Sequence, residues 1–335
     1  MELKAVISAF IGEQNHSVSA IDNGLINHTY FVETDSGKYI LQKINTDIFK
    51  NPKCIIDNHL AVNSVLKNSD YSRKIVDLIP AQNGEFLINR KWRMLEFIEN
   101  SVTHLKVPNS ETAFESAKCF SKFYSVLNSK PIHLEETLPG FIDFGKRISD
   151  YQTALKNASK ERKINAEKEI EFINSHLDLP EKWIELQSEN LLPKRVIHAD
   201  PKISNILFDK NGNAIAVIDL DTVMTSTLLY DFGDMIRSYC NLTDEDDASL
   251  ENNFSPEIYD SVKKGFLFHL ENLLSETEKK LLDYAPKVVI YIQAVRFLTD
   301  HLNGNLYYSV KYGNHNLDRT RNQINLLKNI LLNEK

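Results

Sequence analysis

The sequence is poor in cysteine and has no long apolar run. Its 335 residues include three widely spaced cysteines that form no C-x-x-C pair, Cys54, Cys119 and Cys240. An odd number of scattered cysteines disfavours both a disulfide framework and a zinc knuckle, and it favours a reducing compartment. No apolar stretch is long enough to span a bilayer, and the short apolar run near the N-terminus does not read as a signal peptide. We therefore expect a soluble cytoplasmic protein with no membrane partner.

Basic residues are outnumbered by acidic ones. The chain has 39 Lys and Arg against 46 Asp and Glu, and a formal net charge of -7. Binding to a nucleic-acid backbone needs clustered Lys and Arg, so the balance argues against a nucleic-acid partner. It does not argue against a small anionic ligand in a local basic pocket. The oligomeric state does not follow from the composition.

The first hundred residues are rich in strand patterns, apart from a helical stripe that begins at Pro52 and runs to about Lys67. The predicted strands are Ser17–Ile21, His28–Thr34, Lys38–Ile44, Glu85–Asn89 and Trp92–Ile98. After Asn100 the helical period dominates. The predicted helices are Ser110–Leu127, Phe144–Ala158, Glu161–Leu177, Ser255–Leu273, Glu276–His301 and a last one near Asn316–Leu332.

This order of elements predicts an α+β fold with two lobes. Residues 1–98 would form an antiparallel-sheet lobe, and residues 99–335 a mainly helical lobe that contains one β island. The strands of the island are Arg195–His198, Asn205–Asp209 and Ala214–Asp219. A cleft between two lobes is the usual place for a small-molecule site.

The segment HADPKISN, residues 198–205, gathers four polar side chains between two apolar runs. Phosphoryl transfer needs an oriented hydroxyl whose proton is accepted, a magnesium ion held against the phosphates, and an offset for the transferred charge. Asp200 could accept the proton, Lys202 could reach the γ-phosphate, and Asn205 offers Mg²⁺ an amide oxygen. The structural alternative is a capped turn in which the polar residues coincide by chance.

A second carboxylate should lie close to Asn205. The apolar strand Ala214–Ile218 ends at Asp219, and the tight turn KNGN before it folds the strand back. We therefore predict Asn205 and Asp219 as the metal ligands, with Asp221 as a further ligand or a support. Asp231 begins a DFG triplet like that of protein kinases, but a helical pattern follows it, so we interpret it as a helix cap or a support for the catalytic loop.

HADPKISN followed by VIDLD resembles the aminoglycoside phosphotransferase/choline kinase superfamily of small-molecule kinases, and the resemblance extends over nearly the whole chain. It implies a bilobal protein-kinase-like fold, ATP and Mg²⁺ as cofactors, and a small-molecule substrate. By this resemblance Asp200 is the catalytic base, and Asn205 and Asp219 are the metal ligands.

The nucleotide would bind the first lobe. The run Asp22–Glu33 resembles the G-x-x-N-x-T-Y-x-V stretch of these kinases, in which Asn27 and backbone amides would face the phosphates, although its single glycine, Gly24, departs from a Gly-rich loop. Lys43 ends a strand and would contact the α- and β-phosphates. Asp57 is the one acid between Pro52 and Lys67 and is therefore the candidate partner of Lys43.

Adenine would be read by the segment that leaves the first lobe. The stretch WRMLEFIEN ends the predicted sheet. Its residues Glu96, Phe97 and Ile98 would offer backbone groups to the base, a role that is compatible with an ordinary sheet strand.

The acceptor is suggested by the resemblance alone. VRFLTDHLNGNLYY, with YILQKIN and VIDLDTVM, is most similar to the N-acetylhexosamine 1-kinases. That similarity implies phosphorylation of the anomeric hydroxyl of N-acetylglucosamine or N-acetylgalactosamine, an amino sugar, and places Arg296 and Tyr307 at sugar-binding positions. From the residues themselves, Arg296 could equally pair with Asp300 one helical turn later, and Tyr307 or Tyr308 could be a core residue.

Other acceptors and other classes of protein stay open. Choline should need an aromatic cage, and an aminoglycoside a broad acidic groove, so an acceptor-site arginine suits neither cation. Ethanolamine and homoserine are further alternatives. A non-catalytic kinase fold is disfavoured because the catalytic residues are intact. A protein kinase is disfavoured because only 11 residues separate Asp219 from Asp231. The choice between the gluco and galacto epimers does not follow from the sequence.

Overall fold

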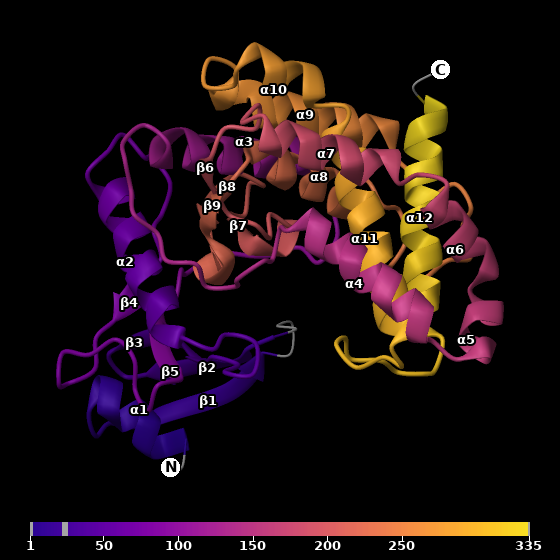
Figure 1. Cartoon of the computed structure of the whole chain (residues 1–335). Helices are drawn as coiled ribbons and strands as arrows, with labels where there is room; N and C mark the ends of the chain where they lie inside the picture. The colour runs from indigo at the N-terminus through magenta and orange to yellow at the C-terminus, as the bar shows by residue number, and fades with distance from the viewer. Residues whose placement is uncertain (1–2, 22–25, 334–335) are drawn as a thin grey trace.

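The molecule is built of two lobes (Figure 1). The computed structural model describes residues 3–21 and 26–333. An antiparallel sheet forms the N-terminal lobe, and helices with two small two-stranded sheets form the rest. The predicted α+β fold with a sheet lobe and a mainly helical lobe is confirmed. A division between residues 98 and 99 stays a prediction.

The sheet of the first lobe has five strands in the order β1-β2-β3-β5-β4, each antiparallel to its neighbours. The strands are β1 (His16–Ile21), β2 (His28–Thr34), β3 (Gly37–Lys43), β4 (Leu78–Ile79) and β5 (Trp92–Glu96). The register of the central pair places Gln42 opposite Arg93 and Lys43 opposite Trp92. This register decides which side chains reach the site.

The two faces of the sheet have different neighbours. Helix α1 (Leu3–Ile11) covers one face, where its apolar side chains join the cluster that contains Leu41. Because side chains alternate along a strand, Lys43 shares the face of Leu41, whereas Ile40 and Gln42 point to the opposite face and line the cleft. α1 is absent from the predicted elements, since its nine residues give only a short periodic pattern.

Helix α2 (Pro52–Lys67) lies on the cleft side of the sheet, where Ile56 packs against Leu78 and Leu95. It begins at Pro52, as predicted; a proline is tolerated there because the first helical N–H groups have no partner within the helix.

The predicted strand Glu85–Asn89 is wrong. Ile88 forms only an isolated bridge with Trp92. Asn89 and Arg90 have φ angles of +50° and +59°, which turn the chain and end an extended segment. The short strand β4 takes the edge position instead.

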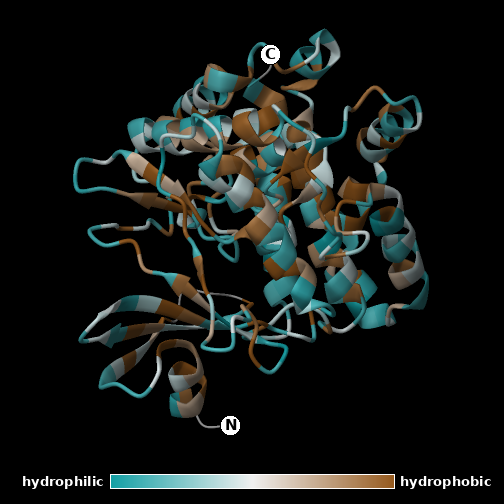
Figure 2. Cartoon of the chain, turned by 90° about the vertical axis from the view of Figure 1, so that its left-hand side faces the viewer, coloured by the Kyte–Doolittle hydropathy of each residue, from teal (hydrophilic) through white to brown (hydrophobic). Residues whose placement is uncertain are grey.

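Helices dominate the second lobe, and α11 runs through its centre with most of its residues buried. Figure 2 shows that hydrophobic stretches of these helices face the interior of the lobe. The helices are α3 (Ser110–Leu127), α4 (Phe144–Asn157), α5 (Lys160–Asn165), α6 (Glu167–Asn174), α7 (Asp178–Ser188), α8 (Leu228–Tyr239), α9 (Pro256–Leu270), α10 (Glu276–Leu281), α11 (Ala285–Leu302) and α12 (His315–Asn333).

Two predicted helices are each divided in two. The predicted helix Glu276–His301 is α10 and α11, because Pro286 lies in the first turn of α11 and cannot continue a preceding helix. The predicted helix Glu161–Leu177 is α5 and α6, with the break at Ala166. Helix α7 is absent from the predicted elements.

The β island inside the helical lobe consists of two antiparallel strand pairs. The pairs are β6 (Arg195–Ile197) with β9 (Met224–Ser226), and β7 (Ile206–Phe208) with β8 (Ala214–Val217). Helix α8 follows them and packs closely on α11. A Cβ atom at Gly233 would lie 2.6 Å from Cγ2 of Val289, so only glycine permits this approach.

Within the two described ranges, no helix combines the length and the apolar character needed to cross a membrane.

Candidate active site

A cavity of about 1120 Å³ lies between the two lobes, and we call it the interlobe cleft. The sheet and α2 contribute one wall, and the β island with α8, α11 and the segment after α11 contributes the other. Every predicted site residue except Lys43 lines it. The predicted residues that line the cleft are Asn27, Glu96, Phe97, Ile98, Asp200, Lys202, Asn205, Asp219, Arg296 and Tyr307. Their individual roles stay predictions.

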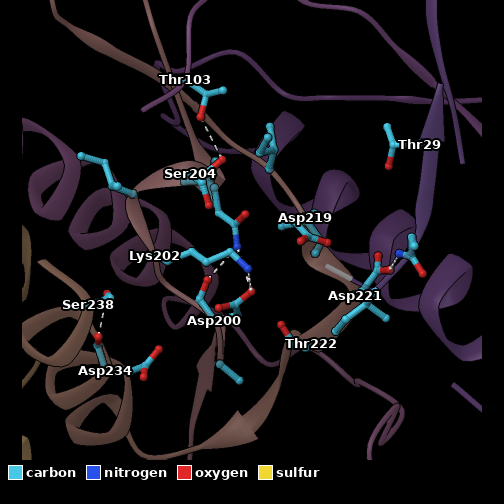
Figure 3. Close-up of a pocket in the computed structure, with 18 of the residues that line it drawn as sticks. Thr29, Thr103, Asp200, Lys202, Ser204, Asp219, Asp221, Thr222, Asp234 and Ser238 are labelled. Atoms are coloured by element: carbon cyan, nitrogen blue, oxygen red, sulfur yellow. Dashed lines mark hydrogen bonds and ion pairs between the residues drawn. The ribbon is translucent and has the colours of Figure 1, made fainter. Parts of the chain in front are cut away.

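The centre of the cleft is the loop between β6 and β7. The Lys202 Nζ atom lies 2.6 Å from Oδ2 of Asp200 (Figure 3). The Asn205 side-chain nitrogen donates to the Asp200 carbonyl at 2.8 Å and to its carboxylate at 3.2 Å. With its nitrogen so occupied, Asn205 presents its amide oxygen for another partner. The sequence order His-x-Asp-x-Lys-x-x-Asn thus produces one compact cluster.

The charge state of Asp200 follows from this cluster. Burial by itself would raise the pKa of Asp200, but the adjacent Lys202 ammonium outweighs it, and the pKa lies below its usual value. Burial likewise opposes the charge of Lys202, yet attraction to Asp200 and Asp219 leaves its pKa raised. The pair is therefore ionised at neutral pH, and the Asp200 carboxylate can accept a proton.

Asp231 supports this loop from beneath. Its carboxylate accepts the backbone N–H of His198 at 2.7 Å, that of Ala199 at 3.0 Å, and the Tyr124 hydroxyl at 2.6 Å. Ala199 has a φ of +64°, a strained angle for alanine that these bonds hold in place. Asp231 is fully buried and does not line the cleft, and the cap of α8 is Thr227. Burial raises the pKa of Asp231 to about 7.

Replacing Asp231 by alanine is expected to lower the free energy of unfolding by about 3 kcal/mol or more, because each buried donor left unpaired costs about 1–3 kcal/mol. Urea denaturation measures the loss. Glu185→Ala, on the exposed side of α7, is the control and should change stability by less than about 0.5 kcal/mol. A wild-type stability for the Asp231 variant would contradict this supporting role.

Asp219 and Asn205 meet through the hairpin of β7 and β8. The Ile218 amide donates to the Asn205 carbonyl at 2.9 Å, and Asp219 then adopts a φ of +62°. This turn directs the Asp219 carboxylate into the cleft (Figure 3), where it stays accessible to solvent. The protein packed around it raises the pKa of Asp219 to about 7, and repulsion from the Asp221 carboxylate adds to this.

Asp221 is engaged rather than free. It is 2 % exposed; one carboxylate oxygen lies 2.6 Å from the Arg93 guanidinium, and the other accepts the Asn27 side-chain amide at 2.8 Å. Both partners come from the sheet lobe, so Asp221 ties the two lobes together. Among the described residues, no group of three or more His, Cys, Asp or Glu is placed to hold a metal ion. Asp219 and Asn205 both line the cleft and carry side-chain oxygens that could bind a metal ion.

Lys43 does not reach the cleft. Its ammonium lies 6.0 Å from the centre of the Trp92 ring, on the face of the sheet that α1 covers. Its proposed partner Asp57 instead pairs with Lys53 at 2.6 Å on an exposed turn of α2. In the paired strands β3 and β5, the side chains of Gln42 and Arg93 line the cleft. When the alternation of β3 is counted from the buried Leu41, the residue predicted to face the cleft is Gln42 and not Lys43.

The predicted phosphate loop is only partly described, because Asp22 to Leu25, including Gly24, lie outside the described residues. Asn27 is described and lines the cleft. Besides its bond to Asp221, its side-chain oxygen accepts the Asn45 amide at 3.0 Å. Asn27 thus fixes the end of its loop against both lobes.

The proposed adenine-reading segment follows β5. The Glu96 amide donates to the Asp77 carbonyl at 2.9 Å, and the Ile98 carbonyl accepts the Ser101 hydroxyl at 2.6 Å. The Ile98 amide has no hydrogen-bond partner within the described part of the chain. It is therefore a donor that a base in the cleft could use.

The far end of the cleft is formed by α11 and the segment after it. Asp300 does not pair with Arg296; its carboxylate accepts the backbone amides of Leu306, Tyr307 and Tyr308. The Arg296 guanidinium donates to Gln293 at 2.9 Å and lies 5.8 Å from the centre of the Tyr308 ring.

Arg296 has no carboxylate partner among the residues that the structure describes. The acids at this end are taken by Arg237, which donates to Asp234 at 2.6 Å and to Glu245 at 2.9 Å. Tyr307, the predicted sugar-binding tyrosine, is 66 % exposed at the rim, and its neighbour Tyr308 is the one that packs near Arg296.

The sequence of residues 17–263 matches the phosphotransferase enzyme family, APH. The chain belongs to this family. The match covers both the sheet lobe and the Asp200 loop, so family membership makes phosphoryl transfer to a small molecule the class of reaction for the protein.

Solved structures share the fold over nearly the whole chain. A microcompartment-associated aminopropanol kinase superposes with a TM-score of 0.67 at 14% identity, covering 99% of this chain and 97% of the other. The Plasmodium vivax ethanolamine kinase gives 0.60 at 17% identity over 92% and 82% of the chains. A choline kinase from Streptococcus pneumoniae gives 0.58 at 14% identity over 98% of both chains. At these identities the likeness establishes the kinase-like bilobal fold.

Proposed function

We propose that the protein is an ATP- and Mg²⁺-dependent kinase that phosphorylates the anomeric hydroxyl of N-acetylglucosamine or N-acetylgalactosamine. The observation that carries the proposal is the cluster of Asp200, Lys202 and Asn205 with Asp219 beside it. This cluster lines the same cleft as the segment after β5 and as Arg296. ATP is supported by family membership and by the fold.

In the proposed reaction, Asp200 orients the acceptor hydroxyl and accepts its proton. An anomeric hydroxyl is more acidic than an ordinary sugar hydroxyl, so a carboxylate is an adequate base. Little proton transfer need precede a loose transition state, and positioning then carries most of the rate enhancement. Lys202, held 2.6 Å from Asp200, would offset negative charge on the phosphoryl group as it moves.

The donors at the cluster fit a magnesium ion. Mg²⁺ prefers hard oxygen ligands and needs only one or two from the protein. Among the described residues, the amide oxygen of Asn205 has no hydrogen-bond partner, and Asp219 is a carboxylate with a raised pKa and no cationic partner within ion-pair distance. When bound, the ion would offset the charge of the nucleotide phosphates. Asp221 is excluded from the first ligands because Arg93 and Asn27 already use its oxygens.

The acceptor end of the cleft favours a neutral sugar over a cation. Arg296 carries an uncompensated charge there, and such a charge repels the ammonium of choline, ethanolamine or an aminoglycoside. A guanidinium can instead donate to ring hydroxyls or to an N-acetyl carbonyl. Tyr307 at the rim would lie against the outer face of the sugar. The solved kinases named above act on amino alcohols, so an amino alcohol is the second candidate acceptor.

Arg296→Ala is expected to lower kcat/KM for the amino sugar by about 10–100-fold, since a hydrogen bond from a charged donor contributes about 1.5–3 kcal/mol. The KM for ATP should not change, because Arg296 lies at the acceptor end. Initial rates over a panel of N-acetylglucosamine, N-acetylgalactosamine, choline and homoserine measure the effect.

The wild-type panel also tests the acceptor itself. Phosphorus NMR of the product should show phosphate on the anomeric oxygen. Turnover of choline with neither sugar would overturn the amino-sugar proposal. A phosphate on O6, with the anomeric carbon still free to mutarotate, would keep the sugar and refute the position.

A further inference from the structure

Arg93 occupies an unusual place for a buried cation. It is the second residue of β5, it is 2 % exposed, and it lines the interlobe cleft. Among the cationic side chains that strands β1 to β5 carry, Arg93 alone lines the cleft. Lys43, the lysine of the neighbouring strand, points to the opposite face. A nucleotide lobe whose sheet presents no lysine to the cleft needs another cation for the phosphates. Lys74 also lines the cleft, but it lies outside the sheet and is exposed.

The hydrogen bonds of the Arg93 guanidinium leave one nitrogen unused. The Nε and NH2 atoms donate to the Gln42 side-chain oxygen at 2.9 and 2.7 Å, and NH2 also lies 2.6 Å from Asp221. NH1 is buried and has no hydrogen-bond partner among the residues that the structure describes. A guanidinium has five N–H groups in a fixed fork, so two N–H groups of NH1 are unsatisfied. Leaving a charged donor unpaired is costly, which indicates that a ligand completes it.

The neighbours of Arg93 identify the chemistry of that ligand. Asn27, at the end of the predicted phosphate loop, binds the same carboxylate that Arg93 binds. Asp219, the proposed metal ligand, follows in the same turn as Asp221. The free face of Arg93 is therefore bordered by the elements that would hold a polyphosphate. A planar guanidinium suits phosphate oxygens well.

We propose that Arg93, held in place by Gln42 and Asp221, is the cation that binds the α- or β-phosphate of the nucleotide, in place of a lysine on β3. This inference rests on the proposed nucleotide-dependent function and assigns a residue to its phosphate subsite. Gln42 and Asp221 act as positioning residues, because each fixes one edge of the guanidinium fork. The ion pair between Asp221 and Arg93 also connects the two lobes. The Arg93 side chain would therefore bind the phosphate and help to align the lobes.

The test compares ADP with adenosine, because the two differ only in the phosphates. Calorimetric titration gives Kd for each, and the ratio of the two reports the phosphate contribution. Arg93→Met should weaken ADP binding by about 10–100-fold, as expected for one charge-assisted hydrogen bond, and leave adenosine unchanged. The double variant Gln42→Lys with Arg93→Met should recover part of the ratio, since a lysine at 42 starts from the cross-strand position on the same face.

Arg195→Met is the matched control. Arg195 is also a partly buried arginine paired with a buried carboxylate, Glu278, at 3.2 Å, but it does not line the cleft. Its loss should lower the melting temperature and leave the ratio of ADP to adenosine affinity at the wild-type value.

If Arg93→Met does not fold, Arg93→Lys is the variant that tests the inference. An ammonium keeps the charge but cannot serve Gln42, Asp221 and a phosphate together, so the ratio should still fall about tenfold. A folded Arg93 variant with the wild-type ratio would overturn the inference and leave Arg93 as a tie between the lobes. A wild-type protein that binds ADP no better than adenosine would instead overturn the proposed nucleotide site itself.

Discussion

Replacing Asp200 by asparagine is expected to lower kcat by about 10²–10⁴-fold, the range for a positioned acid or base, while ATP affinity stays near wild type. Asparagine keeps the shape of the side chain, so Asn205 retains its bond to the Asp200 carbonyl. What the variant loses is the carboxylate that accepts the proton and pairs with Lys202. Single-turnover rates with saturating ATP and sugar separate this chemical step from binding.

Asp209→Asn is the matched control for that experiment. Asp209 belongs to the same β island, but its carboxylate serves the turn between β7 and β8, where it accepts the amides of Asn211 and Asn213. It does not line the cleft, so its loss should leave kcat unchanged. Near-normal turnover by the Asp200 variant would remove Asp200 from the role of base.

Replacing Asp219 by alanine is expected to abolish Mg²⁺-dependent turnover. In the described part of the chain, Asp219 has no cationic partner within ion-pair distance, whereas Asp200 is paired with Lys202 and Asp221 with Arg93. Removing it leaves Asn205 as a single neutral ligand, which is too weak to hold a divalent ion against water. Activity as a function of Mg²⁺ concentration, and binding of Mn²⁺ followed by its paramagnetic signal, measure the loss.

Asp231→Ala supplies the comparison, because Asp231 has the local sequence of a metal-binding DFG triplet but lies outside the cleft. At a temperature where the variant is folded it should bind Mn²⁺ as the wild type does. Loss of Mn²⁺ binding in folded Asp231→Ala, with retention in Asp219→Ala, would reverse the two assignments.

The two-lobe architecture could be predicted because its signals are local. Strand alternation and helical period extend over many residues, and helix α3 has the bounds that its apolar stripe predicts. The Asp200 loop is also local: five residues separate Asp200 from Ile206, and the turn after β7 returns Asp219 to them. Groups that are so close together along the chain have few ways to lie far apart in space.

The sequence does not show on which face of the sheet Lys43 lies, because a shift of one residue in the alternation of a strand exchanges its two faces. Tyr39, Leu41 and Lys43 form one alternating set, and Ile40 and Gln42 form the other. Only the packing of α1 on Leu41 shows which set is covered. The sequence pattern does not predict helix α1, and without that helix it does not show which face of β3 borders the cleft.

Motif spacing and hydrophobic period were enough to predict the family, the two-lobe fold and the compact form of the Asp200 loop. The tertiary structure alone decided three pairings between distant segments. Arg93 meets Asp221 across the lobes, Asp231 meets the amides before Asp200, and Asp300 binds the backbone after Asn305 rather than Arg296. A carboxylate has several possible partners along a chain, and the one it takes depends on which donors the packing of other elements brings within about 3 Å.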